Sequence, residues 1–287
     1  MGLQDWGIRP VTPISDEQFA LWQGLIESKT GMIFTQTRRP FLEISLSARM
    51  REIGAEDYDT YYELIASGAR GEREWLTLVD RLAVQETSFF RHASSYELVD
   101  SYIKNVLAQK KKKSLNLWSA GCSTGEEPYS LALLVEALLA SSGRRDIFYG
   151  ITATDISLPT LAKAKLGIYS ERKLFGVPET LRQTYFRPLD NQRDWQIDQS
   201  LRARVAFAQL NLMELDKAPF HEMDIIFCQN VLIYFRRFRK RDVVTHLAER
   251  LQVGGMLILG VGEVLDWHHP TLERVDYPNT LAYRRVV

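Results

Sequence analysis

The sequence predicts an α/β domain, built on a parallel sheet covered by helices, that follows a small all-α domain. From Leu115 onward short apolar runs alternate with longer amphipathic ones, which is typical of a parallel sheet with helices on its faces. From about residue 14 to residue 93 apolar residues instead recur at helical spacing, and glycines separate the stretches. With 287 residues the chain is long enough for two unequal domains that each bury a core.

Two apolar stripes mark helices in the N-terminal part. The first comprises Phe19, Trp22, Leu25 and Ile26, and the second comprises Phe41, Leu42, Leu46 and Met50. A further helix is expected over 97–113, and we interpret its final lysine run, 110–113, as a solvated helix end and linker. We therefore expect a helical domain over 14–93, a linker helix over 94–114 and the α/β domain over 115–287.

The α/β part divides into expected strands and helices with one interruption. The expected strands are the apolar runs 115–118, 148–153, 205–210, 224–227 and 256–260, and the expected helices are 128–140, 159–166 and 240–251. The pattern breaks between residues 167 and 209, where residues 186–198 resemble two short strands around a polar turn. We therefore expect a small antiparallel β-insertion at about 168–208.

Composition and charge argue against several classes of protein. The chain carries 36 Lys and Arg against 36 Asp and Glu, so the whole chain has no strong attraction to nucleic acid or anionic membrane. No apolar run reaches the roughly 18 residues of a membrane-spanning helix, and the N-terminus does not resemble an export signal. The two cysteines argue against a disulfide framework, and the five histidines show no zinc-binding spacing, so no metal is predicted. A cytoplasmic location is expected.

Residues 120–125 follow an expected strand and precede a helix, so their backbone N–H groups would surround a small ligand. Pro128 suits the first helical turn. The glycine spacing differs from the dinucleotide pattern, and Glu126 and Glu127 would repel a pyrophosphate. S-adenosylmethionine (SAM) instead carries a cationic ammonium and a cationic sulfonium. The loop therefore favours SAM over NAD, although the two glutamates could merely complement the helix dipole.

Polar side chains follow several other expected strands. Asp155 ends the second strand, where such folds bind ribose hydroxyls, although it could only start the next helix. Asn211 follows one later strand, and Gln229 and Asn230 follow another, although Asn is also a common turn residue. Open α/β sheets bind ligands at this carboxyl edge, so these residues are candidate ligand contacts. Cys228 is interpreted as a small buried residue, not a nucleophile.

Several segments together resemble the chemoreceptor glutamate methyltransferases of bacterial chemotaxis, the CheR family. The segments are 38–51, 87–91 (Thr-Ser-Phe-Phe-Arg), 123–130 (Ser-Thr-Gly-Glu-Glu-Pro-Tyr-Ser), 153–155, 167–169, 211–212 and 230–235 (Asn-Val-Leu-Ile-Tyr-Phe). The resemblance covers about residues 14–283. It implies a Rossmann-like class I SAM-dependent methyltransferase domain behind an all-α domain that contacts the receptor. It also implies transfer of methyl groups from SAM to chemoreceptor glutamates in sensory adaptation, with glutamate methyl esters and S-adenosyl-L-homocysteine as products.

The resemblance assigns roles to individual residues. It implies SAM contacts by Thr87, Arg91, Glu127, Asp155, Asn211, Leu212, Cys228 and Gln229, to which we add Asn230 and Gln85. Gln85 stands where the family usually has the shorter Asn, and Glu86 stands where it is usually apolar. Arg91 and Tyr234 are implied beside the transferring methyl, although Tyr234 could simply pack in an apolar run. The implied partner is a cytoplasmic receptor helix, and we expect a monomer without nucleic acid or membrane insertion.

Receptor docking would need basic side chains, for which Arg38, Arg39, Arg49 and Arg51 are candidates. The short turn at 190–194 lacks the glycine of family members that bind a receptor pentapeptide, so we do not expect such tethering. The chain resembles untethered members more closely, including those of pilus-linked systems.

Two other functions compete with this one. A nucleic-acid methyltransferase would use the basic runs 110–113 and 236–241 as phosphate contacts. A non-enzymatic SAM-responsive module would have a decayed site at Gln85 and Glu86.

Overall fold

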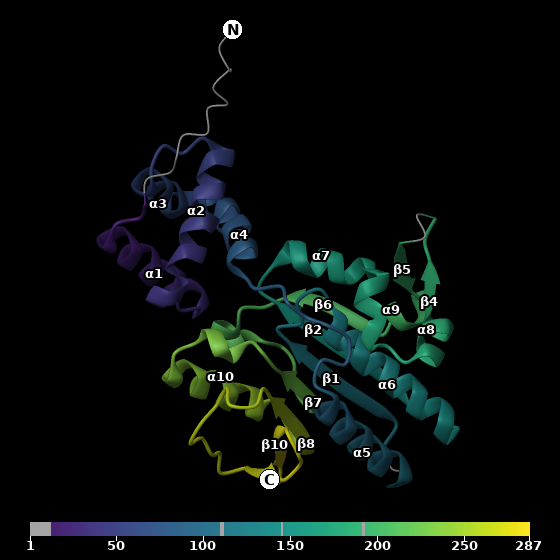
Figure 1. Cartoon of the computed structure of the whole chain (residues 1–287). Coiled ribbons are helices and arrows are strands. Elements are labelled where there is room, and N and C mark those ends of the chain that lie inside the picture. The colour runs from purple at the N-terminus through teal and green to yellow at the C-terminus, as the bar shows by residue number, and fades with distance from the viewer. Residues whose placement is uncertain (1–12, 110–111, 145, 191–192) are drawn as a thin grey trace. The chain divides into compact units, whose positions relative to one another are not determined.

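Two units of different architecture make up the chain (Figure 1). The computed structural model describes residues 13–109, 112–144, 146–190 and 193–287. The units divide after Ala83, earlier in the chain than the boundary expected at residue 93. Helix α5 (Ala93–Gln109), expected from the sequence as a linker, belongs to the second unit and packs on its helix α6 (Glu126–Ser142). Of the lysine run, Lys110 and Lys111 lie outside the described residues.

The first unit is all-helical. Its elements are α1 (Asp16–Thr30), η1 (Gln36–Arg38), α2 (Arg39–Ile53), α3 (Tyr58–Ala66) and α4 (Gly68–Leu82). Helix α1 starts at a capping box, in which Ser15 and Gln18 each accept a hydrogen bond from the backbone N–H of the other. Its stripe residues Phe19, Trp22 and Ile26 are buried, whereas Phe41 of the second stripe remains 37% exposed. Helical periodicity therefore located the core of this unit well.

The second unit is built on a seven-stranded sheet in the order β6-β2-β1-β7-β8-β10-β9. The strands are β1 (Ser114–Ala120), β2 (Phe148–Asp155), β6 (Val205–Gln209), β7 (Met223–Cys228), β8 (Leu251–Leu259), β9 (Leu272–Val275) and β10 (Leu281–Arg285). The first five in sheet order, β6 to β8, are parallel, and β10 and β9 continue the sheet antiparallel. The sequence patterns predicted the five parallel strands but not β9 and β10.

Helices cover both faces of this sheet, as the α/β prediction requires (Figure 1). On one face α5, α6 and α7 (Leu158–Leu166) pack over a core that includes Leu117 and Ile225. On the other face η3 (Leu212–Lys217) and α10 (Arg237–Glu249) pack over a core that includes Trp118 and Ile226. Adjacent residues of β1 and β7 thus face opposite cores, which explains why these strands read as continuous apolar runs.

A small antiparallel sheet interrupts the second unit, as expected. Strands β4 (Phe186–Pro188) and β5 (Asp194–Ile197) form the pair expected from the sequence, and β3 (Ile168–Ser170) adds a third strand to β5. Between β3 and β4 lie η2 (Glu171–Gly176) and α8 (Glu179–Tyr185), and α9 (Gln199–Arg202) follows β5. In the described part of the chain no helix is long and apolar enough to cross a membrane.

Candidate functional site

The carboxyl ends of β1, β2 and β7 meet at the centre of the seven-stranded sheet. Ser119 of β1 is in register with Ala153 of β2 on one side and with Phe227 of β7 on the other. The chain moves from β1 outward to β2 and β6, and then returns to start β7 on the opposite side of β1. This reversal of strand order is the place where open α/β sheets bind ligands.

The loop at residues 121–125 follows β1 and lies at this reversal point. The backbone N–H groups of Gly121 and Cys122 both donate to the carbonyl of Thr154, at 2.8 and 2.9 Å, which ties the loop to the end of β2. Gly121 has a φ of 84°, and a Cβ at this position would lie 2.3 Å from a methyl carbon of Val231. Only glycine therefore allows the loop to approach the segment after β7 so closely.

Asp155 holds the neighbouring loops together. One carboxylate oxygen accepts from the backbone N–H of Ser123 at 2.9 Å, and the other accepts from that of Ser157 at 3.0 Å. The carbonyl of Asp155 accepts from Leu210, which brings Asn211 to the same edge. The Asn211 side chain caps η3 by accepting from Met213 at 3.0 Å. Both residues thus have a structural role as helix or loop caps, and the Asp155 carboxylate brings two acceptor oxygens to this edge.

Glu127 lies partly buried in the first turn of α6. Its carboxylate accepts a hydrogen bond from Ser119 Oγ at 2.7 Å. Burial raises the pKa of Glu127 to about 7, an effect that Ser119 and the positive charge of Arg91 partly oppose. Arg91, although exposed, is therefore close enough to act electrostatically on Glu127. Two residues that the sequence assigned to the site thus interact across it.

Residues 84–92 form a segment without regular secondary structure that ends in a turn and carries Gln85, Thr87 and Arg91. The Phe90 N–H donates to Ser130 Oγ of α6 at 3.0 Å. Arg91 Nη1 donates to the carbonyl of Glu86 at 2.8 Å. Three candidate residues are therefore presented by one segment fixed to the helix that carries Glu127.

The side chains of the last residue of β7 and of the segment that follows it divide into those turned inward and those at the edge. Cys228 is fully buried, and burial raises the pKa of its thiol well above the usual range, as befits an unreactive core residue. Gln229 donates from Nε2 to Ser95 Oγ and to the carbonyl of Leu259, so its side chain points into the protein interior. Asn230 has a φ of 61°, and its Oδ1 lies 2.8 Å from His92 Nε2. Tyr234 is half-buried at the end of η4 (Leu232–Tyr234).

Glu263 is a buried carboxylate of this region that sequence reasoning missed. It is 4% exposed, accepts from the Gly260 N–H at 3.0 Å, and has a pKa raised by burial. Its charge also raises the pKa values of Glu127 and Cys228. The only signal in the sequence is an acidic residue shortly after the apolar run of β8, which by itself is not specific.

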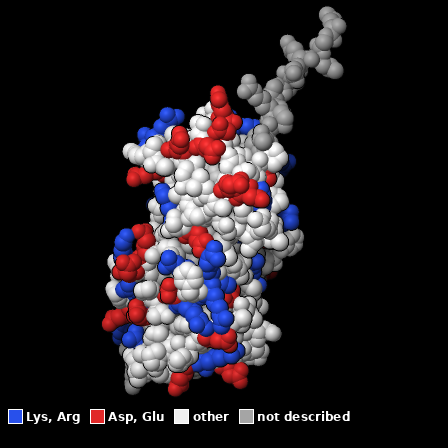
Figure 2. All heavy atoms as spheres, turned by 90° about the vertical axis from the view of Figure 1, so that its left-hand side faces the viewer, with Lys and Arg blue, Asp and Glu red and all other residues white. Residues whose placement is uncertain are grey.

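The two basic runs make contacts within the protein. Lys112 forms an ion pair with the buried Asp224, and Lys113 lies 3.3 Å from Asp146. In the arginine run, Arg237 Nη2 lies 2.9 Å from a carboxylate oxygen of Asp266. On the face drawn in Figure 2, basic and acidic side chains are interspersed.

The family models cover nearly the whole of both units. The model for the CheR methyltransferase SAM binding domain matches residues 85–280, and that for the CheR methyltransferase all-alpha domain matches residues 17–83. The chain belongs to the CheR methyltransferase family. The resemblance inferred from the sequence motifs is thereby confirmed, and the edge described above lies within the SAM-binding domain.

Curated relatives agree with this assignment. The chain is 33% identical to chemotaxis protein methyltransferase 2 of Vibrio cholerae, over 87% of this chain and 86% of the relative. It is 30% identical to the chemotaxis protein methyltransferase of Escherichia coli, over 87% and 85%. Among solved structures, SAM-bound magnesium protoporphyrin IX methyltransferase of Synechocystis is 14% identical, with a TM-score of 0.36 over 84% of this chain and 97% of that one.

The CheR edge has the chemistry that SAM requires. Ser123 Oγ is buried in the loop without a hydrogen-bond partner among the described residues, so it is available to a polar ligand group. Glu127 and Asp155 offer acceptors for cationic and hydroxyl groups, and the loop offers backbone donors. The residues present therefore fit this cofactor.

Proposed function

We propose that this CheR-family protein transfers the methyl group of SAM to glutamate side chains of methyl-accepting chemoreceptors. The products are glutamate methyl esters and S-adenosyl-L-homocysteine, and the reaction serves sensory adaptation. The match of the SAM-binding family model to residues 85–280 carries the proposal. The arrangement of Glu127, Asp155 and the 121–125 loop at one sheet edge supports it.

The reaction needs no general base. A receptor glutamate with an ordinary pKa of about 4.3 is ionised at neutral pH and is itself the nucleophile. SAM supplies an electrophilic methyl group on a sulfonium. The protein therefore has to hold the carboxylate oxygen in line with the methyl–sulfur bond, and orientation of this kind can contribute about 7–11 kcal/mol.

Arg91 and Tyr234 are the residues to which we assign this orientation. Arg91 is exposed on the 84–92 segment, and its positive charge, which acts on Glu127, can attract an anionic side chain. A very tight pair between its guanidinium and the glutamate would stabilise the reactants more than the transition state and would slow transfer. We therefore assign Arg91 to steering, and the Tyr234 hydroxyl to holding the substrate carboxylate by a hydrogen bond.

SAM affinity should depend on pH through Glu127. Because burial raises its pKa to about 7, the ionised form that can pair with a cationic cofactor is lost as the pH falls through this value. We expect the Kd for SAM to rise about tenfold for each pH unit below about pH 7. Isothermal titration calorimetry between about pH 5.5 and 8.5 measures this dependence.

The Glu127→Gln variant provides the control for that titration. It keeps an acceptor for Ser119 but has no charge to lose, so its SAM affinity should be weaker and nearly constant across the range in which Glu127 titrates. Any pH dependence that arises from the cofactor itself is present in both proteins and cancels. An equal pH dependence in the two proteins would show that the charge of Glu127 does not contribute to SAM binding.

Receptor docking requires basic side chains that internal partners do not occupy. Arg39 pairs with Asp16, and Arg49 donates from Nε and Nη2 to Glu74 at 2.6 and 2.7 Å. Arg38 lies over the rings of Phe34 and Phe41. Three of the four arginines suggested by the sequence thus have contacts within their own unit.

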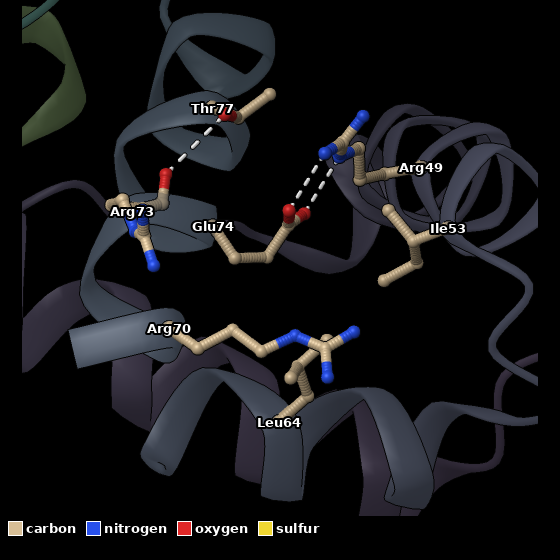
Figure 3. Close-up of a pocket in the computed structure, with 7 residues that line it drawn as sticks. All are labelled: Arg49, Ile53, Leu64, Arg70, Arg73, Glu74 and Thr77. Carbon is tan, nitrogen blue, oxygen red and sulfur yellow. Dashed lines mark hydrogen bonds and ion pairs between the residues drawn. The ribbon is translucent and has the colours of Figure 1, made fainter. Parts of the chain in front are cut away.

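Arg70 and Arg73 are better candidates. They line a pocket of about 240 Å³ in the first unit, together with Arg49, Ile53, Leu64, Glu74 and Thr77 (Figure 3). Glu74 points toward Arg49 and also accepts from the Tyr61 hydroxyl at 2.8 Å. In the described part of the chain, the guanidinium groups of Arg70 and Arg73 have no hydrogen bond or ion pair. They are therefore available for carboxylates of an acidic receptor helix.

Reversing both of these charges should weaken receptor docking. We expect Arg70→Glu with Arg73→Glu to raise the receptor KM about tenfold, because like charges then oppose the partner. The Kd for SAM should stay unchanged. Steady-state methylation at varied receptor concentration measures the effect.

The matched control is Lys163→Glu with Lys165→Glu, which makes the same change in net charge on exposed residues of α7. An equal rise in KM in the control would point to overall charge rather than to the Arg70 and Arg73 pair. An unchanged KM in the Arg70 and Arg73 variant would place docking elsewhere.

The proposed function itself is tested by methyl transfer. The protein is incubated with methyl-labelled SAM and chemoreceptor-containing membranes, and mild alkali then releases the methyl groups of carboxyl esters as methanol. Alkali-labile label on a receptor band is expected. SAM binding without any such label would favour a binding module or another substrate instead.

A further inference from the structure

The 84–92 segment is held in place largely by the region of the β-insertion. Phe89 is 2% exposed, and its ring packs edge-on against Tyr169 of β3 and Phe186 of β4, with centroid distances of 5.0 and 5.7 Å. A Cβ added at Gly176 would lie only 2.5 Å from the Phe89 carbonyl oxygen. The end of η2 therefore lies against the backbone of the segment, at a distance that only glycine permits.

Lys173 of η2 makes the polar link between three parts of the molecule. Its Nζ donates to the Thr87 carbonyl at 3.1 Å and to Glu126 Oε1 at 2.6 Å. The segment that carries Gln85, Thr87 and Arg91 is thus joined to the first turn of α6 through one ammonium group.

Glu126 is built into this link and does not share the role of Glu127. It is fully buried, and its second carboxylate oxygen accepts from Thr124 Oγ1 at 2.6 Å. Lys173 is the cation paired with it among the described residues. Tyr169 adds a further contact by donating to the Thr124 carbonyl at 2.8 Å. The acidic pair of the sequence motif therefore divides into one glutamate at the cofactor edge and one that anchors the insertion.

We propose that Lys173, paired with Glu126, is a positioning residue for the cofactor site. It fixes the 84–92 segment to the first turn of α6, so the β-insertion region supports SAM binding. This inference rests on the proposed function, because it assumes that SAM contacts the 84–92 segment and Glu127. It gives the insertion a role within the enzyme that does not depend on any receptor tail.

The physical reason is preorganisation. Thr87 lies next to Glu86, whose carbonyl accepts a hydrogen bond from Arg91. It also lies three residues before Phe90, whose N–H donates to Ser130 Oγ. Without the ammonium group the Thr87 carbonyl loses its donor and the segment gains freedom, which SAM must then restrict on binding. The free-energy cost of ordering the segment therefore weakens SAM binding more than it slows the chemical step.

The test compares SAM affinity in Lys173→Met and Lys173→Arg. We expect Lys173→Met to raise the Kd for SAM about tenfold or more, with a smaller change in kcat at saturating SAM. Lys173→Arg can donate to both acceptors and should restore most of the affinity. Calorimetry gives Kd, and hydrogen exchange should show faster exchange of the amides in 84–92 in the Met variant.

A second variant covers the case in which Lys173→Met leaves a buried charge and does not fold. The double variant Lys173→Met with Glu126→Gln removes both charges and should still lose SAM affinity. Lys217→Met is the matched control, since this exposed lysine pairs with its helical neighbour Glu214. A folded Lys173→Met protein with unchanged Kd and unchanged exchange in 84–92 would overturn the proposal.

The same data separate this inference from the proposed function. If the wild-type protein binds no SAM, the proposed function fails. If the wild-type protein binds SAM and the Lys173 variants bind it equally well, only the positioning role fails.

Discussion

Replacing Arg91 with alanine should lower the turnover of receptor methylation at least about tenfold at saturating SAM and receptor. The reason is that we assign Arg91 to steering the substrate carboxylate, whereas its contacts give it little part in the fold. It is exposed, and Arg91 Nη1 donates a hydrogen bond to the nearby carbonyl of Glu86, so the thermal stability should hardly change when it is removed. Steady-state kinetics with a purified receptor fragment measures the effect.

The Arg91→Ala variant has a second, independent consequence. The positive charge of Arg91 lowers the pKa of Glu127, so its removal should shift the pH midpoint of SAM binding upward. Arg172→Ala is the matched control, because Arg172 is an exposed arginine of η2 without a side-chain partner in the described part of the chain. Unchanged turnover in Arg91→Ala would show that Arg91 has no role in methyl transfer.

The Asp155→Ala variant should lose both SAM binding and stability. Its carboxylate accepts two backbone N–H groups, from Ser123 and Ser157, and is assigned to the ribose hydroxyls of SAM. We expect the free energy of unfolding to fall by about 2–4 kcal/mol, and the Kd for SAM to rise by about a hundredfold. Chemical denaturation and calorimetry measure the two effects separately.

Asp155→Asn separates the two roles of this residue. The amide keeps one acceptor oxygen of similar shape, so stability should recover partly while SAM affinity remains reduced. Asp146→Ala provides a control aspartate at the surface, paired with Arg144 at 2.7 Å. If Asp155→Asn bound SAM as tightly as the wild-type protein, Asp155 would be only a loop cap.

The fold was predictable where burial imposes a repeating pattern. Strands β1 and β7 are buried on both faces and appear as apolar runs, and α1 shows its buried face at helical spacing. Strands β9 and β10 did not show this pattern. β9 consists of exposed and half-buried residues, and β10 combines Ala282 and Tyr283 with arginines, so neither resembles the buried strands. β3 is three residues long, too short for any period to be visible.

The site was predictable where function depends on the end of a strand. Asp155 could be placed at the ligand edge because it follows an apolar run, and the same holds for Asn211. The contacts between distant residues could not be found in this way. Nothing in the sequence relates Lys173 to Glu126, or His92 to Asn230, because these pairs depend on how the insertion and the 84–92 segment pack. The inward orientation of the Gln229 side chain could not be predicted from the sequence for the same reason.

The separation of Glu126 from Glu127 shows why a motif alone can mislead. The two residues are adjacent and chemically identical, and either could complement the dipole of α6. In the structure Glu126 is buried and paired with Lys173, whereas Glu127 is partly exposed at the cofactor edge with a pKa of about 7. Only the residue at the edge should respond to the cofactor.

The most direct test of the account is to locate the transferred methyl group by mass spectrometry. The protein is incubated with SAM and a receptor cytoplasmic fragment, and the peptides are mapped at mildly acidic pH, at which methyl esters survive. We expect methyl esters on receptor glutamate side chains, present with the wild-type protein and strongly reduced with Arg91→Ala. Methyl groups found on other residue types, or esters that form equally well with Arg91→Ala and Asp155→Ala, would contradict the proposed function and its site.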